Sequence, residues 1–190
     1  MKKVIVIDNY DSFTYNLVHI LRELGLGESL KVVRNDAFEL REIAAFDYIL
    51  LSPGPGLPKD AGLMPRVIKE FASEKNILGV CLGHQAIAEA FGSTLLNLPR
   101  VFHGMVTPID VVEEDTLFSG LPKRFDVCRY HSWVVDPENL GKDLLVTSRA
   151  ENGNIMSIKH TSYNVRGIQF HPESIMTEHG KQLIKNWLGE

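Results

Sequence analysis

The stretch Lys3–Asp8, KVIVID, decides the fold class. Its β-branched residues follow one another without polar alternation, which is typical of a strand that is covered on both faces. A turn at Asn9–Asp11 comes next, and Ser12 is then a candidate cap for a helix whose leucines recur on one face and which ends near Gly25. This strand–helix order predicts parallel βαβ units with helices on both faces of the sheet.

The same alternation continues through the first half of the chain and then gives way to strands alone. Further strands are predicted over Leu30–Val33, Tyr48–Leu51 and Ile77–Val80, and helices over Ala37–Ala45, Pro65–Ser73 and Leu82–Phe91. The second half has strand candidates at Val106–Val112, Phe125–Tyr130, Leu144–Ser148, Ile155–His160 and Val165–Phe170, hairpin turns at Asn152–Asn154 and Ser162–Asn164, and a last helix over Thr177–Leu188. We therefore expect one α/β domain over residues 1–190. It should be a three-layer sandwich with a flavodoxin-like open sheet, parallel in its core and antiparallel or mixed towards the C-terminus.

Composition narrows the function classes. The chain has 190 residues, of which 44% are apolar, and a formal net charge of −4. Because no run of Lys and Arg occurs, the sequence gives no electrostatic reason to bind nucleic acid or an anionic membrane. No apolar stretch is long enough for a secretory signal or a membrane span. The two cysteines, Cys81 and Cys128, make no disulfide framework. We expect a cytoplasmic protein with free thiols and with no nucleic-acid or membrane partner.

A candidate nucleophile lies where the buried strand Ile77–Val80 meets the next helix. The residues Gly79–Gly83 read GVCLG, the pattern of a nucleophile elbow with Cys in place of Ser. Small residues two positions before and after the thiol let strand and helix pack through a sharp turn. The helix N-terminus favours thiolate over thiol, and the N–H of Leu82 is placed to hold an oxyanion. Taken alone, the pattern also fits a Cys81 that merely packs as a small apolar side chain.

His171 is the best-placed base for this thiol. It ends the apolar strand Gly167–Phe170, and sites in open α/β sheets gather at the C-terminal ends of parallel strands. Residues i and i+2 of an extended segment face the same way, about 6–7 Å apart. Glu173 can therefore orient the His171 ring and stabilise its imidazolium, while Pro172 stiffens the segment. The alternative is that His171 caps a strand and Glu173 is solvated.

The loop Ser52–Gly56, SPGPG, also ends a predicted strand. It is a poor phosphate cradle because no Gly-Lys-Ser/Thr follows and its two prolines lack backbone donors. We interpret it as a stiff loop that brings a glycine N–H close to a reacting carbonyl, although a plain tight turn also fits. His131 is a further candidate for lining the site, whereas His84 fits packing equally well. No histidine has zinc-ligand spacing with cysteines or acids, so no metal site is predicted.

Together these motifs resemble those of class-I glutamine amidotransferases. The SPGPG loop, the segment Gly79–Gln85 (GVCLGHQ) and the segment Phe170–Ser174 (FHPES) follow one another in that order. The start Asp8–Asn16 (DNYDSFTYN) and the segment Arg129–Ser132 (RYHS) narrow the resemblance to the small subunits of anthranilate synthase and of aminodeoxychorismate (para-aminobenzoate) synthase. The resemblance extends from the first strand to the last helix.

The resemblance implies a glutaminase that passes ammonia to a second protein. The residues that it implies are the catalytic triad Cys81, His171 and Glu173, the oxyanion donors Gly54 and Leu82, and the substrate-binding residues Gly54, Pro55, Gly56, Gln85, Ser132 and Trp133. The expected partner is a chorismate-binding synthase subunit that holds magnesium, so no cofactor is expected in this chain. Two positions depart from the usual pattern. Met105 stands where relatives often have Lys, and Trp133 stands where they usually have Leu, which alters the pocket shape but spares contacts made by the backbone.

Two other function classes remain open from the sequence. The first is a stand-alone γ-glutamyl cysteine hydrolase, which would turn over without any synthase. The second is a binding module with a degenerate site, in which Cys81 would react with thiol reagents no faster than Cys128. The motifs are also shared between the anthranilate and aminodeoxychorismate subunits, so either pathway, or both, fits the sequence.

Overall fold

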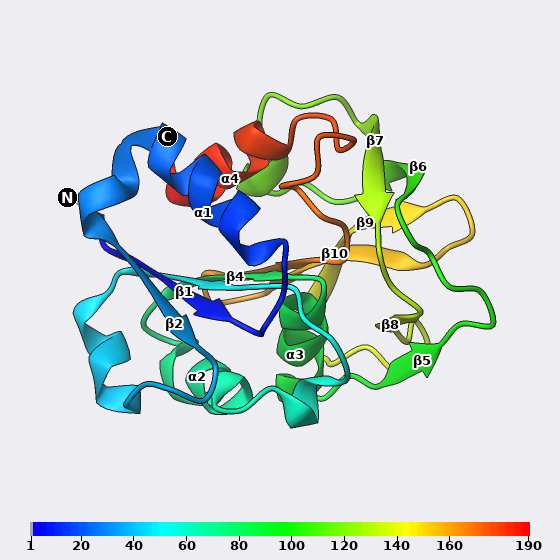
Figure 1. Ribbon diagram of the computed structural model, residues 1–190. Helices are drawn as coiled ribbons and strands as arrows, with labels where there is room; N and C mark the ends of the chain where they lie inside the picture. The colour runs from blue at the N-terminus through cyan, green and yellow to red at the C-terminus, as the bar shows by residue number, and fades with distance from the viewer. Residues whose placement is uncertain (1) are drawn as a thin grey trace.

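The computed structural model describes residues 2–190, and eleven strands are assigned within that range. They are β1 (Val4–Asp8), β2 (Leu30–Arg34), β3 (Tyr48–Leu51), β4 (Asn76–Val80), β5 (Leu95–Asn97), β6 (Met105–Val111), β7 (Arg124–Arg129), β8 (Trp133–Val135), β9 (Leu144–Ala150), β10 (Ile155–His160) and β11 (Val165–Ile168). Nine of them form one sheet in the order β2-β1-β3-β4-β11-β10-β9-β6-β7 (Figure 1). The pairings from β2 to β11 are parallel, and those from β11 to β7 are antiparallel. The first five strands in this order follow the flavodoxin arrangement, so the predicted mixed α/β sheet is confirmed.

Helices cover both faces of the parallel part of this sheet. The helices are α1 (Thr14–Leu21), α2 (Met64–Phe71), α3 (Leu82–Ala90) and α4 (Gly180–Leu188). In Figure 1, α1 and α4 lie on one face, and α2 and α3 lie on the other. The alternation of β1 explains this, because Val4 and Val6 pack in one hydrophobic core with α1 and α4 while Ile5 and Ile7 pack in the other. Within residues 2–190, none of the helices has the length and apolar character that a membrane span requires.

The start of α1 differs from the prediction. Ser12 does not cap it; the helix begins after Phe13, without any side-chain cap. Instead, Asp8 Oδ1 accepts a hydrogen bond from Thr14 Oγ1 at 2.9 Å, and Asp11 Oδ1 accepts one from the Phe13 N–H at 2.7 Å. These two carboxylates hold the turn after β1, so the prediction that Ser12 is the cap was wrong.

Two other predicted helices are shorter than expected. Only Leu40–Ala45 is helical within the predicted segment Ala37–Ala45, as a 3-10 helix (η3) that begins with a capping box between Glu39 and Glu42. The last helix begins at Gly180 rather than Thr177, because His179 before it has φ +58° in the left-handed region. The remaining short helices are η1 (Arg22–Leu26), η2 (Gly27–Ser29), η4 (Pro58–Asp60) and η5 (Thr116–Phe118).

A small second sheet was not predicted. β5 and β8 pair in antiparallel fashion, with Asn97 opposite Trp133. Next to this pair, the Leu98 N–H bonds to the carbonyl of Ser132 at 2.7 Å, and the Phe102 N–H bonds to the carbonyl of His131 at 2.9 Å. The segment 97–102 thus fixes the backbone of residues 131–133 beside the sheet.

Candidate active site

The turn at Cys81 has the strained geometry expected of a nucleophile elbow. Its φ and ψ are +52° and −100°, a conformation that non-glycine residues rarely adopt. A Cβ at Gly79 would lie 2.4 Å from the backbone of Gly83, and a Cβ at Gly83 would lie 2.5 Å from the carbonyl oxygen of Leu51. Both glycines are therefore required by close backbone approach, as the sequence predicted.

The helix behind Cys81 offers backbone donors. Gln85 donates its N–H to the carbonyl of Cys81 at 3.1 Å, so helical hydrogen bonding begins there. The N–H groups of residues 82–84 have no partner inside α3, since the first N–H groups of any helix lack one. The Cys81 residue is 6% exposed, and its Sγ accepts a hydrogen bond from Gln169 Nε2 at 3.5 Å. The thiol in turn donates to the carbonyl of Tyr130 at 3.8 Å, so its sulfur is held at the helix N-terminus.

His171 and Glu173 form a buried pair beside this elbow. β4 and β11 are neighbours in the sheet, with Val80 opposite Ile168, so the residues that follow each strand come to the same edge. His171 Nδ1 and Glu173 Oε1 are 2.6 Å apart, and both side chains are almost fully buried. Burial alone would lower the pKa of His171, but the nearby Cys81 and the hydrogen-bonded carboxylate of Glu173 raise it above its ordinary value. The imidazolium form of His171 is thus stabilised next to the Cys81 elbow.

The surroundings of His171 fix its ring and its backbone. The Phe13 and Tyr130 rings stand edge-on to the imidazole, with centroids 5.4 Å and 5.1 Å away. Thr177 Oγ1 donates to the carbonyl of His171 at 2.6 Å and accepts from the N–H of Cys128 at 2.9 Å. Thr177 was expected to start the last helix, but it clamps the histidine segment to β7 instead. Within residues 2–190, His171 Nε2 has no hydrogen-bond partner, so it is available to a reacting group.

The Ser52–Gly56 loop is held against β1 by Asn9, a turn residue whose contact with this loop was not predicted. Asn9 donates from its N–H to Ser52 Oγ and from Nδ2 to the carbonyl of Ser52, both at 2.8 Å. A Cβ at Gly54 would lie 2.6 Å from Asn9 Cβ and 2.7 Å from Leu82 Cδ2. Only glycine fits there, so the loop approaches the elbow closely, as predicted.

A cavity of about 160 Å³ opens at Cys81. It is lined by Gly54, Gly56, Cys81, Gln85, Tyr130, His131, Ser132 and Trp133. The structure therefore brings together the predicted substrate-binding residues except Pro55. Pro55 lines a neighbouring cavity of about 220 Å³, together with Asn9, Tyr10 and Leu82.

The floor of the Cys81 cavity is a hydrogen-bond network that includes one residue missed from sequence. Gln85 Nε2 donates to the carbonyl of Trp133 at 2.9 Å and to Gln169 Oε1 at 3.1 Å, and Gln169 in turn bonds to Cys81 Sγ. The contact to Trp133 uses its backbone, so the unusual side chain there does not disturb it. Gln169 is the one polar residue in the apolar segment Gly167–Phe170, a signal that could have identified it.

His131 is held neutral at the edge of the cavity. Arg129 Nε donates to His131 Nε2 at 3.1 Å, and because guanidinium cannot accept, Nε2 is the acceptor. His131 Nδ1 then carries the proton and donates to the carbonyl of Trp133 at 3.0 Å. Burial, with the Arg129 charge, lowers the pKa of His131 to about 3. This histidine positions the wall of the cavity rather than exchanging protons at neutral pH.

His84 makes the stability of the fold sensitive to acid. It is fully buried on α3, and burial lowers its pKa to about 3. The unfolded chain takes up a proton near pH 6.5 that the folded chain refuses, so stability is lost as pH falls below 6.5. Between pH 6.5 and pH 5, His84 lowers the free energy of unfolding by about 2 kcal/mol. We therefore expect His84→Met to reduce the drop in unfolding free energy between pH 7 and pH 5 by about 2 kcal/mol.

Urea unfolding of both proteins at the two pH values measures this difference. His131 and His171 contribute equally to the pH dependence of both proteins, so their effects cancel in the comparison. An equal drop in the wild type and the variant would contradict the assignment of His84 as a neutral core residue.

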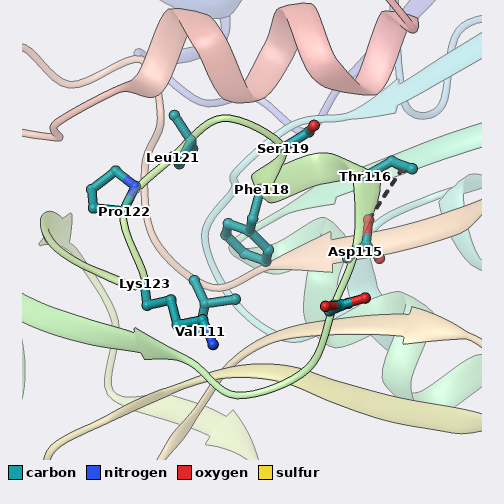
Figure 2. A pocket seen from close by; sticks show the side chains of 9 residues that line it. Val111, Asp115, Thr116, Phe118, Ser119, Leu121, Pro122 and Lys123 are labelled. Carbon is teal, nitrogen blue, oxygen red and sulfur yellow. Dashed lines mark hydrogen bonds between the residues drawn. The ribbon is translucent and has the colours of Figure 1, made fainter.

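A larger cavity lies away from the elbow. It has a volume of about 460 Å³ and is lined by residues between Val111 and Lys123, with the Phe118 ring in the middle of the view in Figure 2. It contains none of the residues described above, so volume alone does not locate the site. Within residues 2–190, no cluster of three or more His, Cys, Asp or Glu side chains could hold a metal ion.

Comparisons with known proteins agree with this geometry. The sequence profile of the family "Glutamine amidotransferase class-I" matches residues 5–190. The aminodeoxychorismate/anthranilate synthase component 2 of Bacillus subtilis is 45% identical over 187 residues, which cover 97% of this chain and 95% of that protein. The aminodeoxychorismate synthase component 2 of Escherichia coli is 46% identical over 187 residues, 97% of this chain and 98% of that protein.

A solved structure from Thermoplasma acidophilum superposes with a TM-score of 0.88 at 27% identity, covering 100% of this chain and 93% of that one. The profile match, the full-length relatives and the shared fold lead to the same result. The chain belongs to the class-I glutamine amidotransferase family.

Proposed function

We propose that this chain is the glutaminase subunit of a chorismate-using synthase, with Cys81 as nucleophile, His171 as base and Glu173 as the residue that orients it. One observation carries the proposal. A thiol on a strained elbow opens into a small cavity, with a buried His–Glu pair of raised histidine pKa beside it. This is the arrangement that amide hydrolysis through a thioester requires.

In the first step, the Cys81 thiolate attacks the side-chain carbonyl carbon of glutamine. The developing oxyanion is held by the N–H groups of Leu82 and Gly54, which lie on two elements that approach each other closely. His171 gives its proton to the amide nitrogen, the C–N bond breaks, and ammonia leaves a γ-glutamyl thioester. Glu173 stabilises the imidazolium before that transfer.

In the second half of the reaction, His171 removes a proton from water, which attacks the thioester carbonyl. The C–S bond breaks, glutamate is released, and the thiolate–imidazolium pair is restored. Gln85, Ser132 and Trp133 would hold the amino and carboxylate end of glutamine, and all three line the Cys81 cavity together with Gly56. The backbone carbonyl of Trp133 is already fixed by Gln85 and His131.

The proposed partner is a chorismate-binding synthase subunit, and magnesium would belong to that subunit. The relatives described above are named component 2 of such synthases. Exposed apolar side chains next to the site support docking of a protein there, because Tyr10 is 54% exposed, Met176 41% and Ile175 fully exposed. Tyr10 follows the loop anchor Asn9, and the other two follow Glu173. The chain would work in the cytoplasm, where the free thiols of Cys81 and Cys128 stay reduced.

The test is glutamate release from glutamine by this chain alone and with each candidate synthase subunit plus chorismate. We expect low release by the chain alone and a rise of at least about tenfold with the correct subunit, because docking completes and closes the site. Stimulation by only one subunit assigns the pathway to anthranilate or to aminodeoxychorismate, and stimulation by both assigns it to both.

Full turnover without any subunit would instead favour a stand-alone γ-glutamyl hydrolase. Cys128→Ala is the control for the assignment of Cys81 as nucleophile, because this second buried thiol lies on β7 outside the cavity. The variant should still release glutamate in the same reaction. Loss of release in that variant would mean that the nucleophile has been assigned wrongly.

A further inference from the structure

A buried cation without a counter-ion lies behind the cavity wall. Arg129, at the end of β7, is 2% exposed. Its Nε bonds to His131, its Nη1 bonds to Thr107 Oγ1 at 3.4 Å, and its Nη2 has no partner within residues 2–190. None of the ion pairs in the described part of the chain involves it; five other arginines, such as Arg124 and Arg166, do pair with carboxylates. A guanidinium buried without an anion is costly, so its retention calls for an explanation.

A second arginine adds to the same positive charge. The Arg129 guanidinium carbon lies 3.5 Å from the centre of the Phe102 ring, and that of Arg100 lies 5.5 Å from the same ring. Arg100 is exposed, and within residues 2–190 its one hydrogen-bond acceptor is Met105 Sδ, at 3.5 Å. Burial, and then the charge of Arg100, lowers the pKa of Arg129 to about 10, which leaves Arg129 positive at pH 7. Two cations therefore converge on one aromatic side chain.

The two arginines line one cavity of about 220 Å³. The other residues that line it are Phe102, Thr107, Pro108, Ala150, Glu151 and Asn152. The cavity thus offers guanidinium, hydroxyl and amide groups to a ligand. Its one carboxylate, that of Glu151, is already paired with Arg124.

We propose that this cavity binds one carboxylate group, held by Arg129 and Arg100. A planar guanidinium matches a carboxylate with two parallel hydrogen bonds, and Nη2 of Arg129 is free to make one of them. Glu151 at the rim repels a second negative charge, so a monoanion is preferred to a dianion such as phosphate. The carboxylate comes either from a free small acid or from an acidic side chain of a partner protein.

The site is connected to the Cys81 cavity by a short path. Arg129 donates to His131, His131 donates to the Trp133 carbonyl, and that carbonyl also accepts from Gln85. An anion that draws the guanidinium towards itself changes the strength of the bond to His131. Occupancy of the carboxylate site and the shape of the glutamine-facing wall are therefore linked.

The experiment measures the thermal unfolding midpoint of the chain in increasing sodium acetate, with sodium chloride at equal ionic strength as reference. A ligand that binds only the folded state raises the midpoint in a saturable way. We expect acetate to do so, and inorganic phosphate to act more weakly. Arg129→Met should abolish the acetate-specific rise, and Arg100→Met should weaken acetate binding by about tenfold, the effect of one lost charge-assisted hydrogen bond.

Arg124→Met is the matched control, because this exposed arginine already pairs with Asp110 and Glu151. It should not weaken acetate binding. If Arg129→Met does not fold, the Arg100→Met comparison decides. An acetate rise no larger than that with chloride, or one equal in wild type and Arg100→Met, would overturn the proposal.

The source of the carboxylate is identified with the assembled complex. The Nε–H resonance of Arg129 in nitrogen-15 spectra reports the occupant directly, whether or not the complex is active. A resonance that moves with acetate in the free chain, but is already shifted and unresponsive in the complex, assigns the site to an acidic side chain of the partner. A resonance that still responds to acetate in the complex assigns it to a free acid.

Discussion

Cys81→Ser is expected to reduce glutamine hydrolysis on the order of 10⁴-fold, because nucleophile and base act as a unit and the loss of one removes most of their joint effect. A serine hydroxyl at the elbow does not ionise at neutral pH, so the pair with His171 no longer supplies an anionic nucleophile. The measurement is glutamate release by the complex with its synthase subunit. The cavity keeps its shape, since Ser differs from Cys by a single atom.

The same variant provides its own control in the complex. Ammonia supplied directly as an ammonium salt bypasses Cys81, so synthesis from chorismate and ammonia should remain within about twofold of the wild type, the spread of a change that leaves the partner's chemistry untouched. Glutamate release that persists in Cys81→Ser would show that a different residue is the nucleophile. Loss of the ammonia-dependent reaction as well would show that the variant has disrupted the complex instead.

Gly83→Ala is expected to destabilise the fold by about 3 kcal/mol, the upper part of the range for overpacking a core. The added Cβ would stand 2.5 Å from the carbonyl oxygen of Leu51, which is backbone in a central strand and cannot move aside. Helix α3 must therefore shift away from β3, and Cys81 shifts with it. Urea unfolding monitored by circular dichroism measures the change in free energy.

Gly27→Ala is the matched control for this prediction. Gly27 has φ −51° and ψ −41°, and a Cβ there would have no neighbouring atom within 4 Å. Its substitution should change stability by no more than about 0.5 kcal/mol, as at other open surface positions. Equal effects at the two positions would mean that close packing of the elbow is not what requires Gly83.

The strands of the parallel core could be predicted because their sequence pattern has few alternatives. Stretches such as Lys3–Asp8 and Ile77–Val80 are continuous apolar runs, which suit only a strand covered on both faces. The start of α1 could not be predicted in the same way. Ser12 is a plausible cap by residue type, but α1 begins without a side-chain cap, and the buried contact of Asp8 with Thr14 holds its first turn instead.

In the candidate site, too, features set by local sequence could be predicted, and features set by contacts between distant segments could not. The elbow was predictable because the glycine spacing around Cys81 reflects backbone geometry over five consecutive residues. The network of Gln85, Gln169 and Trp133 was not predicted, because it depends on which strands are neighbours in the sheet. The pair β5–β8 was missed because Leu95–Asn97 has only three residues, none of them buried.

The position of β11 has a consequence for how the protein is made. Among the strands assigned in residues 2–190, β11 comes last in the sequence, yet it lies in the middle of the nine-stranded sheet, between β4 and β10. Until the ribosome has released it, both neighbours have an unpaired edge and the histidine that follows it is absent. Such late, long-range pairing slows folding and exposes strand edges to other chains. A nascent chain can therefore carry its thiol elbow without any ability to hydrolyse glutamine, and acquires that ability only after β11 and His171 have been synthesised.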